Sequence, residues 1–310
     1  MYGPFGYRFR AAIEADLEPA AAVLVADQLD DVGTVVLDAD FLRNRWGRAG
    51  FDLARDAWVA VDGGGVVVAY GQAMLEEPAI VESFGIVHPG HRGRGIGSAL
   101  LDRIEARAGE RLAGVPSPRF RHSINATDAA AAAMLMARDL RPVRHFWHMQ
   151  LDLDGPIEPG PAPDRIEIAG ITSPDDLPAV HAVLEEAFAD HWGNYPEPYD
   201  RWVDEEATGD GYDPVLWLRA TEDGEMLGAL TGNLWDDRGW VGYLGVRARG
   251  RGRGIGAALL RTSFARFAAR GARHVVLNVD AENTTGATAL YERVGMRVVN
   301  RWDLWERSAG

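Results

Sequence analysis

Hydrophobic and polar positions follow the same order of periods in each half of the chain. An apolar residue at every third or fourth position predicts an amphipathic helix, whereas a short apolar run or strict alternation predicts a strand. In the first half, strands are predicted at residues 7–10, 57–61, 66–70, 81–87, 121–124 and 143–151. Helices are predicted at residues 16–31, 37–46, 96–112 and 128–138.

The second half repeats this order. Strands are predicted at residues 165–169, 215–221, 226–234, 239–246, 274–279 and 296–305, and helices at 173–188, 197–207, 255–267 and 284–294. Leu17 corresponds to Leu177 and Arg92 to Arg251, at a nearly constant offset of about 160 residues, which indicates duplication of a whole domain.

The segment between the halves, residues 154–164, is rich in proline and glycine and is therefore predicted to be an extended linker. It divides the chain into a first domain at 1–153 and a second at 165–310. A length of 310 residues suits two domains, each large enough to bury a core.

Composition narrows the functional classes. The formal net charge of −14 argues against a nucleic-acid partner, because phosphate backbones require a basic face. Cysteine is absent, which excludes disulfides, thiolate metal sites and a cysteine nucleophile and is compatible with a cytoplasmic location. No apolar run is long enough for a membrane span, and the first residues lack a signal-peptide pattern, so no membrane partner is expected.

One turn in each half is rich in arginine and glycine and lies between a predicted strand and a predicted helix. The first reads His-Arg-Gly-Arg-Gly-Ile-Gly over residues 91–97, and the second reads Arg-Gly-Arg-Gly-Ile-Gly over 251–256. Backbone amides at a helix N-terminus have no partner within the helix, and glycine lets an anion approach them. Both turns are therefore candidate phosphate-binding sites.

Three interpretations of these turns compete. A nucleoside-triphosphate loop requires Gly-x-x-x-x-Gly-Lys-Ser/Thr, which the sequence lacks. A dinucleotide fingerprint fits residues 252–257 loosely, but the other copy ends in Ser98, and each turn follows a hairpin meander instead of opening a βαβ unit. The third interpretation, which we favour, rests on a six-residue motif that occurs twice, as Arg92-x-x-Gly95-x-Gly97 and as Arg251-x-x-Gly254-x-Gly256.

In this motif the sequence resembles the GNAT superfamily of N-acetyltransferases, whose signature after the fourth strand is (Arg/Gln)-x-x-Gly-x-(Gly/Ala). The resemblance covers nearly the whole chain, because strand, turn, helix, strand and helix surround the signature twice. It implies an α/β (α+β) fold of two tandem domains, each a mixed, mostly antiparallel twisted sheet flanked by helices. It also implies an acyltransferase that moves an acetyl group from acetyl-CoA directly to a primary amine of a small molecule.

By the same resemblance, turn amides would hold the pyrophosphate of acetyl-CoA, and the strand before the turn would offer main-chain groups to the pantetheine arm. The cofactor-binding residues implied in the second half are Leu244, Val246, Arg251, Gly252, Arg253, Gly254, Ile255, Gly256 and Asn283. Those implied in the first half are Val87, Arg92, Gly93, Arg94, Gly95, Ile96 and Gly97. Acetyl-CoA, or CoA, could thus bind once in each domain.

The two halves differ at the position of the expected acid. In the family, a tyrosine at the position of Tyr291 protonates the leaving thiolate; the alternative is a core aromatic, although Leu290 beside it is the better core candidate. Aligning the halves places Met136 at the position of Tyr291 and Asp128 at that of Asn283. Methionine cannot donate a proton, so the first domain is predicted to be catalytically degenerate and the chemistry to occur in the second.

The general base is less clearly marked. Tyr243, on the fourth strand of the second domain, is a catalytic candidate, with core packing as the alternative. Asp236 and Asp237 could act through a water, but a solvated hairpin turn explains them better. Glu82 is an isolated carboxylate on an apolar strand of the first domain.

The aromatic and polar segment at residues 190–202 lies where the family builds its acceptor pocket. The residues it offers to an amine-bearing substrate are Asp190, His191, Trp192 and Tyr195, with Glu197 as a further carboxylate. A capping hydrophobic cluster explains the segment equally well. His145 and His148 point to opposite faces of a predicted strand, so they are interpreted as structural, and no metal site is predicted.

Two alternative functions remain open. The chain is similar in length and domain order to a tandem family member that acetylates the cysteinyl amine of a thiol-glycoside. It departs from that enzyme because residues 239–246, its fourth strand, contain no carboxylate. The other alternative is a non-catalytic acyl-CoA-binding or regulatory protein. The expected oligomeric state is a monomer or a homodimer.

Overall fold

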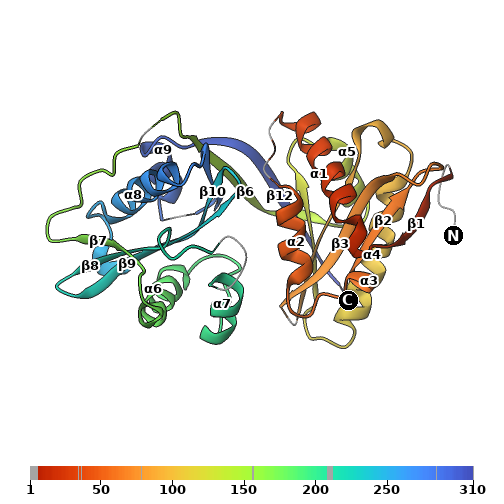
Figure 1. The fold of residues 1–310 in the computed structure, drawn as a ribbon. Helices are drawn as coiled ribbons and strands as arrows, with labels where there is room; N and C mark the ends of the chain where they lie inside the picture. The colour runs from red at the N-terminus through yellow and green to blue at the C-terminus, as the bar shows by residue number, and fades with distance from the viewer. Residues whose placement is uncertain are drawn as a thin grey trace. The chain divides into compact units, whose positions relative to one another are not determined.

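The computed structural model describes residues 6–33, 35, 37–77, 79–155, 157–207, 212–283 and 285–309. The chain forms two compact units (Figure 1), one made of residues 1–146 and 300–310 and the other of residues 147–299. No described helix is both long enough and apolar enough to cross a bilayer.

The first unit is a six-strand arrangement in the order β1-β2-β3-β4-β5-β12, with β4 and β5 parallel and its other neighbouring pairs antiparallel. Its strands are β1 (Arg8–Ala11), β2 (Ala57–Val61), β3 (Val67–Glu77), β4 (Ile80–Val87), β5 (Arg119–Asn125) and the end of β12 (Arg297–Ser308). Its helices are α1 (Leu17–Asp31), α2 (Ala39–Gly47), α3 (Leu53–Asp56), α4 (Ile96–Leu112) and α5 (Ala129–Met136), with 3-10 turns at Glu14–Asp16 and Pro89–His91.

The second unit has the corresponding order β7-β8-β9-β10-β11-β6, with β10 and β11 parallel. Its strands are β7 (Glu167–Gly170), β8 (Leu218–Glu222), β9 (Glu225–Trp235), β10 (Arg238–Val246), β11 (His274–Asp280) and the end of β6 (Arg141–Asp152). Its helices are α6 (Leu177–Phe188), α7 (Tyr199–Glu206), α8 (Ile255–Ala269) and α9 (Ala287–Arg293), with 3-10 turns at Pro174–Asp176 and Ala248–Gly250. The predicted fold class is confirmed in both units.

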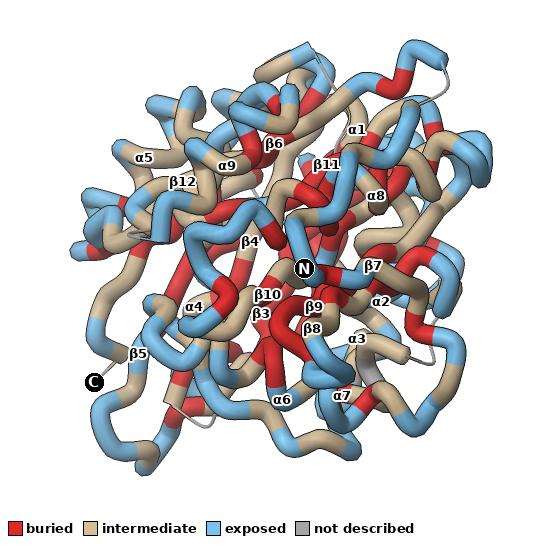
Figure 2. Tube along the Cα trace, turned by 90° about the vertical axis from the view of Figure 1, so that its left-hand side faces the viewer, coloured by how far each residue is buried: buried red, intermediate tan, exposed pale blue. Residues whose placement is uncertain are grey.

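Each sheet carries a core on both faces, because successive strand residues point to opposite sides. In the first unit Ala60 joins the cluster under α4, whereas its neighbours Val59 and Val61 join the cluster under α1 and α2. In the second unit α8 and α9 cover one core, and α6 and α7 cover the other. Figure 2 shows that the buried residues concentrate along the strands.

The two units exchange their closing strands. Residues 147–152 of β6 lie beside β11 in the second unit, while residues 302–308 of β12 pair with β5 in the first. The sequence analysis expected consecutive domains, with residues 300–310 in the second. The difference arises because an apolar alternation identifies a strand but not the sheet that it joins. The predicted linker, in its described part, has no regular secondary structure.

Candidate active site

The glycine turn of the second unit presents amides that have no partner among the described residues. Gly252 and Gly254 have φ angles of +74° and +81°, in the left-handed region that favours glycine. Gly254 is the residue before α8, where no side chain accepts a hydrogen bond from the helix amides. The first amide bonded back to the turn is that of Ala258, which donates to Gly254 O at 3.1 Å. The amides of residues 255–257 therefore remain for an anion.

The turn of the first unit has nearly the same backbone. Gly93 and Gly95 have φ angles of +73° and +74°, and Ala99 N donates to Gly95 O at 3.1 Å. The sequence thus predicted both turns, and their backbone form alone does not distinguish the two units.

The strand before the turn does distinguish them. In the second unit β10 contains a β-bulge between Val241 and Leu244 in its pairing with β9, and the amide of Tyr243 donates to Thr231 Oγ1 at 2.9 Å. Pairing of β10 with the parallel strand β11 extends only from Arg238–His274 to Trp240–Val276. Beyond the bulge, the end of β10 is therefore unpaired on its β11 side, which opens a gap beside the predicted pantetheine-binding residues.

In the first unit the corresponding strand is regular. β4 pairs with β3 without interruption from Val81 to Val87, and with β5 from Ile80 to Phe84. The register shift in that hairpin lies at Leu75–Glu77, at the opposite end of β4 from the glycine turn. The first unit therefore has the turn without the bulge, and its β4 is unpaired on the β5 side only over residues 85–87, after the pair Phe84–Ser123.

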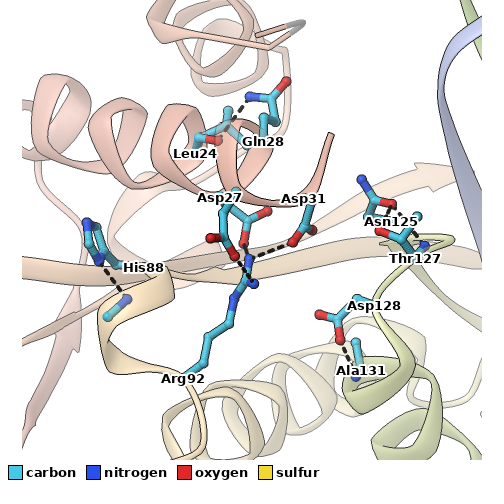
Figure 3. Close-up of polar contacts among 12 residues, drawn as sticks. Leu24, Asp27, Gln28, Asp31, His88, Arg92, Asn125, Thr127, Asp128 and Ala131 are labelled. Carbon is cyan, nitrogen blue, oxygen red and sulfur yellow. Dashed lines mark hydrogen bonds and ion pairs between the residues drawn. The ribbon is translucent and has the colours of Figure 1, made fainter. Parts of the chain in front are cut away.

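The arginine of the first turn is held by carboxylates of α1 (Figure 3). Arg92 lies 2.7 Å from Asp27, 2.9 Å from Asp30 and 3.0 Å from Asp31. Burial, opposed by Arg92 and assisted by the neighbouring carboxylates of Asp31 and Asp128, raises the pKa of Asp27 to about 6. Burial likewise raises the pKa of Asp31. We call Asp27, Asp30 and Asp31 the carboxylate clamp.

The second unit has different residues at two of the three corresponding positions, because Asp190 stands where the first unit has Asp30. With the offset that relates α1 to α6, Ala187 replaces Asp27 and His191 replaces Asp31. Arg251 donates through Nε to Val246 O at 3.1 Å, and in the described part of the chain it forms no salt bridge. Burial lowers the pKa of His191, and the charge of Arg251 adds to this effect, so the two side chains are close enough to interact.

Tyr291 lies in α9 and is 8% exposed, within the core cluster of α8 and α9. A Cβ atom on Gly256 would lie 3.0 Å from Leu290 Cδ2, so α9 packs directly against the start of α8 and its turn. Burial raises the pKa of Tyr291 to about 12, which keeps its hydroxyl protonated at neutral pH. Leu290, expected to be the core residue of this pair, is only partly buried.

The position that corresponds to Tyr291 in the first unit has no acid. Met136 is 52% exposed at the end of α5. Asp128 caps α5 by accepting from Ala131 N, whereas Asn283 accepts from Thr285 N in the loop after β11. Both side chains are thus occupied with local backbone in this structure.

A cavity of about 70 Å³ opens in the second unit between α6, α7 and β10. It is lined by His181, Leu184, Glu185, Phe188, Asn194, Tyr195, Glu197, Trp202 and Tyr243. Of the predicted acceptor-binding residues, Tyr195 and Glu197 therefore line the cavity, as does Tyr243, whereas Asp190, His191 and Trp192 do not. The Tyr243 ring packs edge-on against Phe188 with centroids 5.6 Å apart.

Five further residues named in the sequence analysis lie outside the site or have structural partners. Asp236 and Asp237 are exposed in the β9–β10 turn, at the opposite end of β10 from the glycine turn, so neither can reach the site. Glu82 pairs with Arg121 at 3.1 Å, and burial raises its pKa. His145 and His148 bond Asp303 and Asn278 through Nδ1, at 2.7 and 2.6 Å.

The sequence analysis missed Glu185, His181 and Thr231, and it placed Trp202 in the segment at 190–202 without naming it as a substrate-binding residue. Glu185 and His181 are one turn apart on α6 and lie on the same face as Leu184 and Phe188, a pattern that resembles an ordinary amphipathic helix. Thr231 lies in an apolar strand, where threonine is common and carries no functional signal.

Comparison with known proteins identifies the family. Residues 177–296 match the family described as Acetyltransferase (GNAT) family, and residues 54–135 match Acetyltransferase (GNAT) domain. The chain is 30% identical to a mycothiol acetyltransferase of Cellulomonas flavigena over 77% of this chain and 71% of that protein.

Solved structures give the same result over nearly the whole chain. A GCN5-related N-acetyltransferase from Sphaerobacter thermophilus is 32% identical and superposes with a TM-score of 0.87, covering 99% of this chain and 96% of the other. A tandem GNAT protein from the clavulanic acid biosynthesis pathway shares the fold at a TM-score of 0.71 and 19% identity, over 98% and 99% of the two chains.

This chain therefore belongs to the GNAT acetyltransferase family and is an acyltransferase with two GNAT domains in tandem. Members of this family in general use acetyl-CoA or CoA. Membership in an enzyme family disfavours the alternative of a non-catalytic acyl-CoA-binding protein.

Proposed function

We propose that the second unit transfers the acetyl group of acetyl-CoA to a primary amine of a small molecule, without a covalent enzyme intermediate. One observation carries this proposal: the bulged end of β10, the free amides of the turn and a buried tyrosine lie together in the second unit only. The first unit has an uninterrupted β4 and Met136 at the position of the tyrosine. Direct transfer requires only that two reactants be held together and two protons be moved.

The donor half of the site fits acetyl-CoA. The amides of residues 255–257 would bind the pyrophosphate, with Arg251 and Arg253 on the same turn. Leu244 and Val246, on the unpaired side of β10, would offer main-chain groups to the pantetheine arm. Arg253 is already paired with Glu222 at 2.8 and 2.9 Å, so we assign the cationic contact chiefly to Arg251.

Tyr291 would supply the proton for the departing thiolate. Its hydroxyl is protonated at neutral pH because burial raises its pKa to about 12, and α9 places it beside the turn. When the amine nitrogen bonds to the acetyl carbon and the carbon–sulfur bond breaks, the sulfur takes up the tyrosine proton.

Glu185 is our choice for the group that takes the proton of the amine. Its carboxylate lines the cavity, 3.9 Å from His181 Nε2 and 3.4 Å from the amide of Glu197. The other carboxylate of the cavity, Glu197, forms a salt bridge with Arg201 at 3.2 Å. Glu185 therefore carries the less compensated charge, which suits an ammonium group that must bind and then lose a proton.

The acceptor class follows from the cavity walls. Phe188, Tyr195, Trp202 and Tyr243 are aromatic, and Glu185 is anionic. We propose a cationic amine with an apolar or aromatic body, which aromatic faces and a carboxylate would bind together. Tyr243 would then be a wall of the acceptor site and not the proton acceptor.

A second candidate function is that of mycothiol acetyltransferase. The 30% identity to the Cellulomonas flavigena enzyme favours it. Against it stands β10, which has no carboxylate over Arg238–Val246, although the resemblance noted in the sequence implies one early in this strand for that activity. Turnover of mycothiol lacking its acetyl group, at a rate well above that of simple amines, would support this alternative.

The test is release of CoA thiol from acetyl-CoA with a panel of primary amines. Tyr291→Phe should lower kcat about 100-fold or more, the usual contribution of a general acid. Met136→Leu, at the corresponding position of the first unit, is the matched control and should leave turnover unchanged. Equal activity of Tyr291→Phe and wild type, or a loss in Met136→Leu, would refute the assignment to the second unit.

Glu185 has its own test. Glu185→Gln should lower kcat/KM about 100-fold or more at neutral pH and remove the decline of the rate at acid pH, because that decline reports protonation of the base. Glu197→Gln keeps the cavity shape and serves as control. If Glu185→Gln keeps the wild-type pH profile, another group takes the proton.

A further inference from the structure

The carboxylate clamp engages both terminal nitrogens of the signature arginine of the first unit, Arg92. Three carboxylates surround one guanidinium at 2.7, 2.9 and 3.0 Å, so the cluster has a surplus of negative charge next to the glycine turn. The Asp27 and Asp31 side chains are only 17% and 10% exposed, which limits screening by solvent. Figure 3 shows Asp128 near the same cluster, and its charge raises the pKa of both Asp27 and Asp31.

A diphosphate needs the opposite arrangement. It carries negative charge, and amides of a turn bind it well only if nearby charges do not oppose it. A carboxylate that remains ionised within several ångströms lowers the affinity of an anion by about tenfold or more. Even if only part of the clamp is ionised at neutral pH, Arg92 is already engaged and cannot pair with a phosphate.

The second unit serves as an internal control for this reasoning. The turn backbones agree, yet Ala187 and His191 stand where the first unit has Asp27 and Asp31. Among the residues that the structure describes, Arg251 bonds only the carbonyl of Val246 at the end of β10. The two turns therefore differ in the side chains around them, at the end of α1 in the first unit and at the end of α6 and just beyond it in the second, and not in the path of the turn.

We infer that the carboxylate clamp closes the first glycine turn to CoA, so that this chain binds one CoA, at the second turn. This rests on acetyl-CoA as the proposed donor. It replaces the expectation of one CoA in each domain with a single site. The carboxylate clamp also connects the end of α1 to the first glycine turn through ion pairs, which gives this turn a structural role in its unit.

Binding of CoA to the full chain tests the inference, with calorimetry for the stoichiometry and hydrogen–deuterium exchange for the location. We expect one CoA per chain and slower exchange in the peptide that spans residues 251–257, with no change at 92–98. Two CoA per chain, or slower exchange at 92–98, would overturn it. If no CoA binds at all, the proposed function fails instead.

The double variant Asp27→Ala with Asp31→His installs the residues of the second unit. It should bind a second CoA and show slower exchange at 92–98 when CoA is present. Asp27→Glu with Asp31→Glu retains the charge and should remain at one CoA. A double alanine–histidine variant that folds, as judged by circular dichroism, yet still binds a single CoA would show that the clamp is not what closes the turn.

Discussion

The hydrogen bond at the bulge of β10 allows a sharp test of how the donor site is built. Thr231 is 2% exposed, and its hydroxyl accepts from the amide of Tyr243 at 2.9 Å. Thr231→Val keeps the shape but places a methyl group where the acceptor was. The amide then lacks a partner and meets a methyl group closer than van der Waals contact permits.

The expected cost follows from these contacts. An unsatisfied buried amide costs about 1–3 kcal/mol, and we take about 2 kcal/mol for this half-buried strand. For a unit of this size that corresponds to a decrease in Tm of about 4–8 °C. Because the bulge turns the end of β10 away from β11, we also expect weaker CoA binding, by about tenfold.

Thermal unfolding and CoA titration of the same preparations measure both effects. Thr231→Ser keeps the hydroxyl and loses only a methyl group, so it should retain CoA affinity and lose less stability than the valine variant. Wild-type Tm and CoA affinity in Thr231→Val would refute the proposed role of this hydrogen bond. Equal damage in the serine variant would assign the effect to packing.

The remaining predictions concern residues of both units and the stability of the fold. Gly239→Ala would place a Cβ atom 2.6 Å from the buried ring of Phe267 and should cost about 1–3 kcal/mol in unfolding free energy, partly recovered by adding Phe267→Leu. Asp56 is 0% exposed and pairs with two arginines of α4, so Asp56→Asn should lower the free energy of unfolding by about 3 kcal/mol or more, as measured by denaturant titration. Asp102→Asn removes an exposed ion pair and should lower it by less than about 1 kcal/mol in the same titration. Burial lowers the pKa of His148 to about 4, below its unfolded value, so its stabilisation is present above pH 6.5 and decreases as the pH falls. Going from pH 7 to 5 should therefore cost about 2 kcal/mol through His148, in addition to the loss from the buried His122, whose pKa burial also lowers, to about 3. A His148→Gln variant that lost as much stability as wild type over this range would contradict this origin.

Much of the fold was predictable because it rests on local patterns. Strand alternation and helical spacing set the order of elements. Ser173, where the helix at 173–188 was expected to begin, accepts from Asp175 N and caps the 3-10 turn that precedes α6. The two turns were predictable because positive φ angles select glycine at positions such as Gly254.

The remaining features depend on contacts between residues far apart in sequence. Asp27 and Asp31 are one helical turn apart, a spacing that resembles a solvated face, and only the fold brings Arg92 to them. Glu185 gains its candidate role because β10 packs beside α6, where a Cβ on Gly245 would lie 2.9 Å from Ala187 Cβ. Side-chain chemistry that arises from such packing leaves no periodic signal in a single sequence.

The exchange of closing strands has a consequence for the timing of synthesis. β5 obtains its partner, residues 302–308, only after every residue of the second unit has left the ribosome. While the rest of the chain is translated, the backbone groups on that side of β5 therefore form an unpaired sheet edge in the first unit. Removal of the last ten residues should thus damage the first unit, whose other residues were made first, and a nascent chain paused at residue 299 should bind chaperones through that edge.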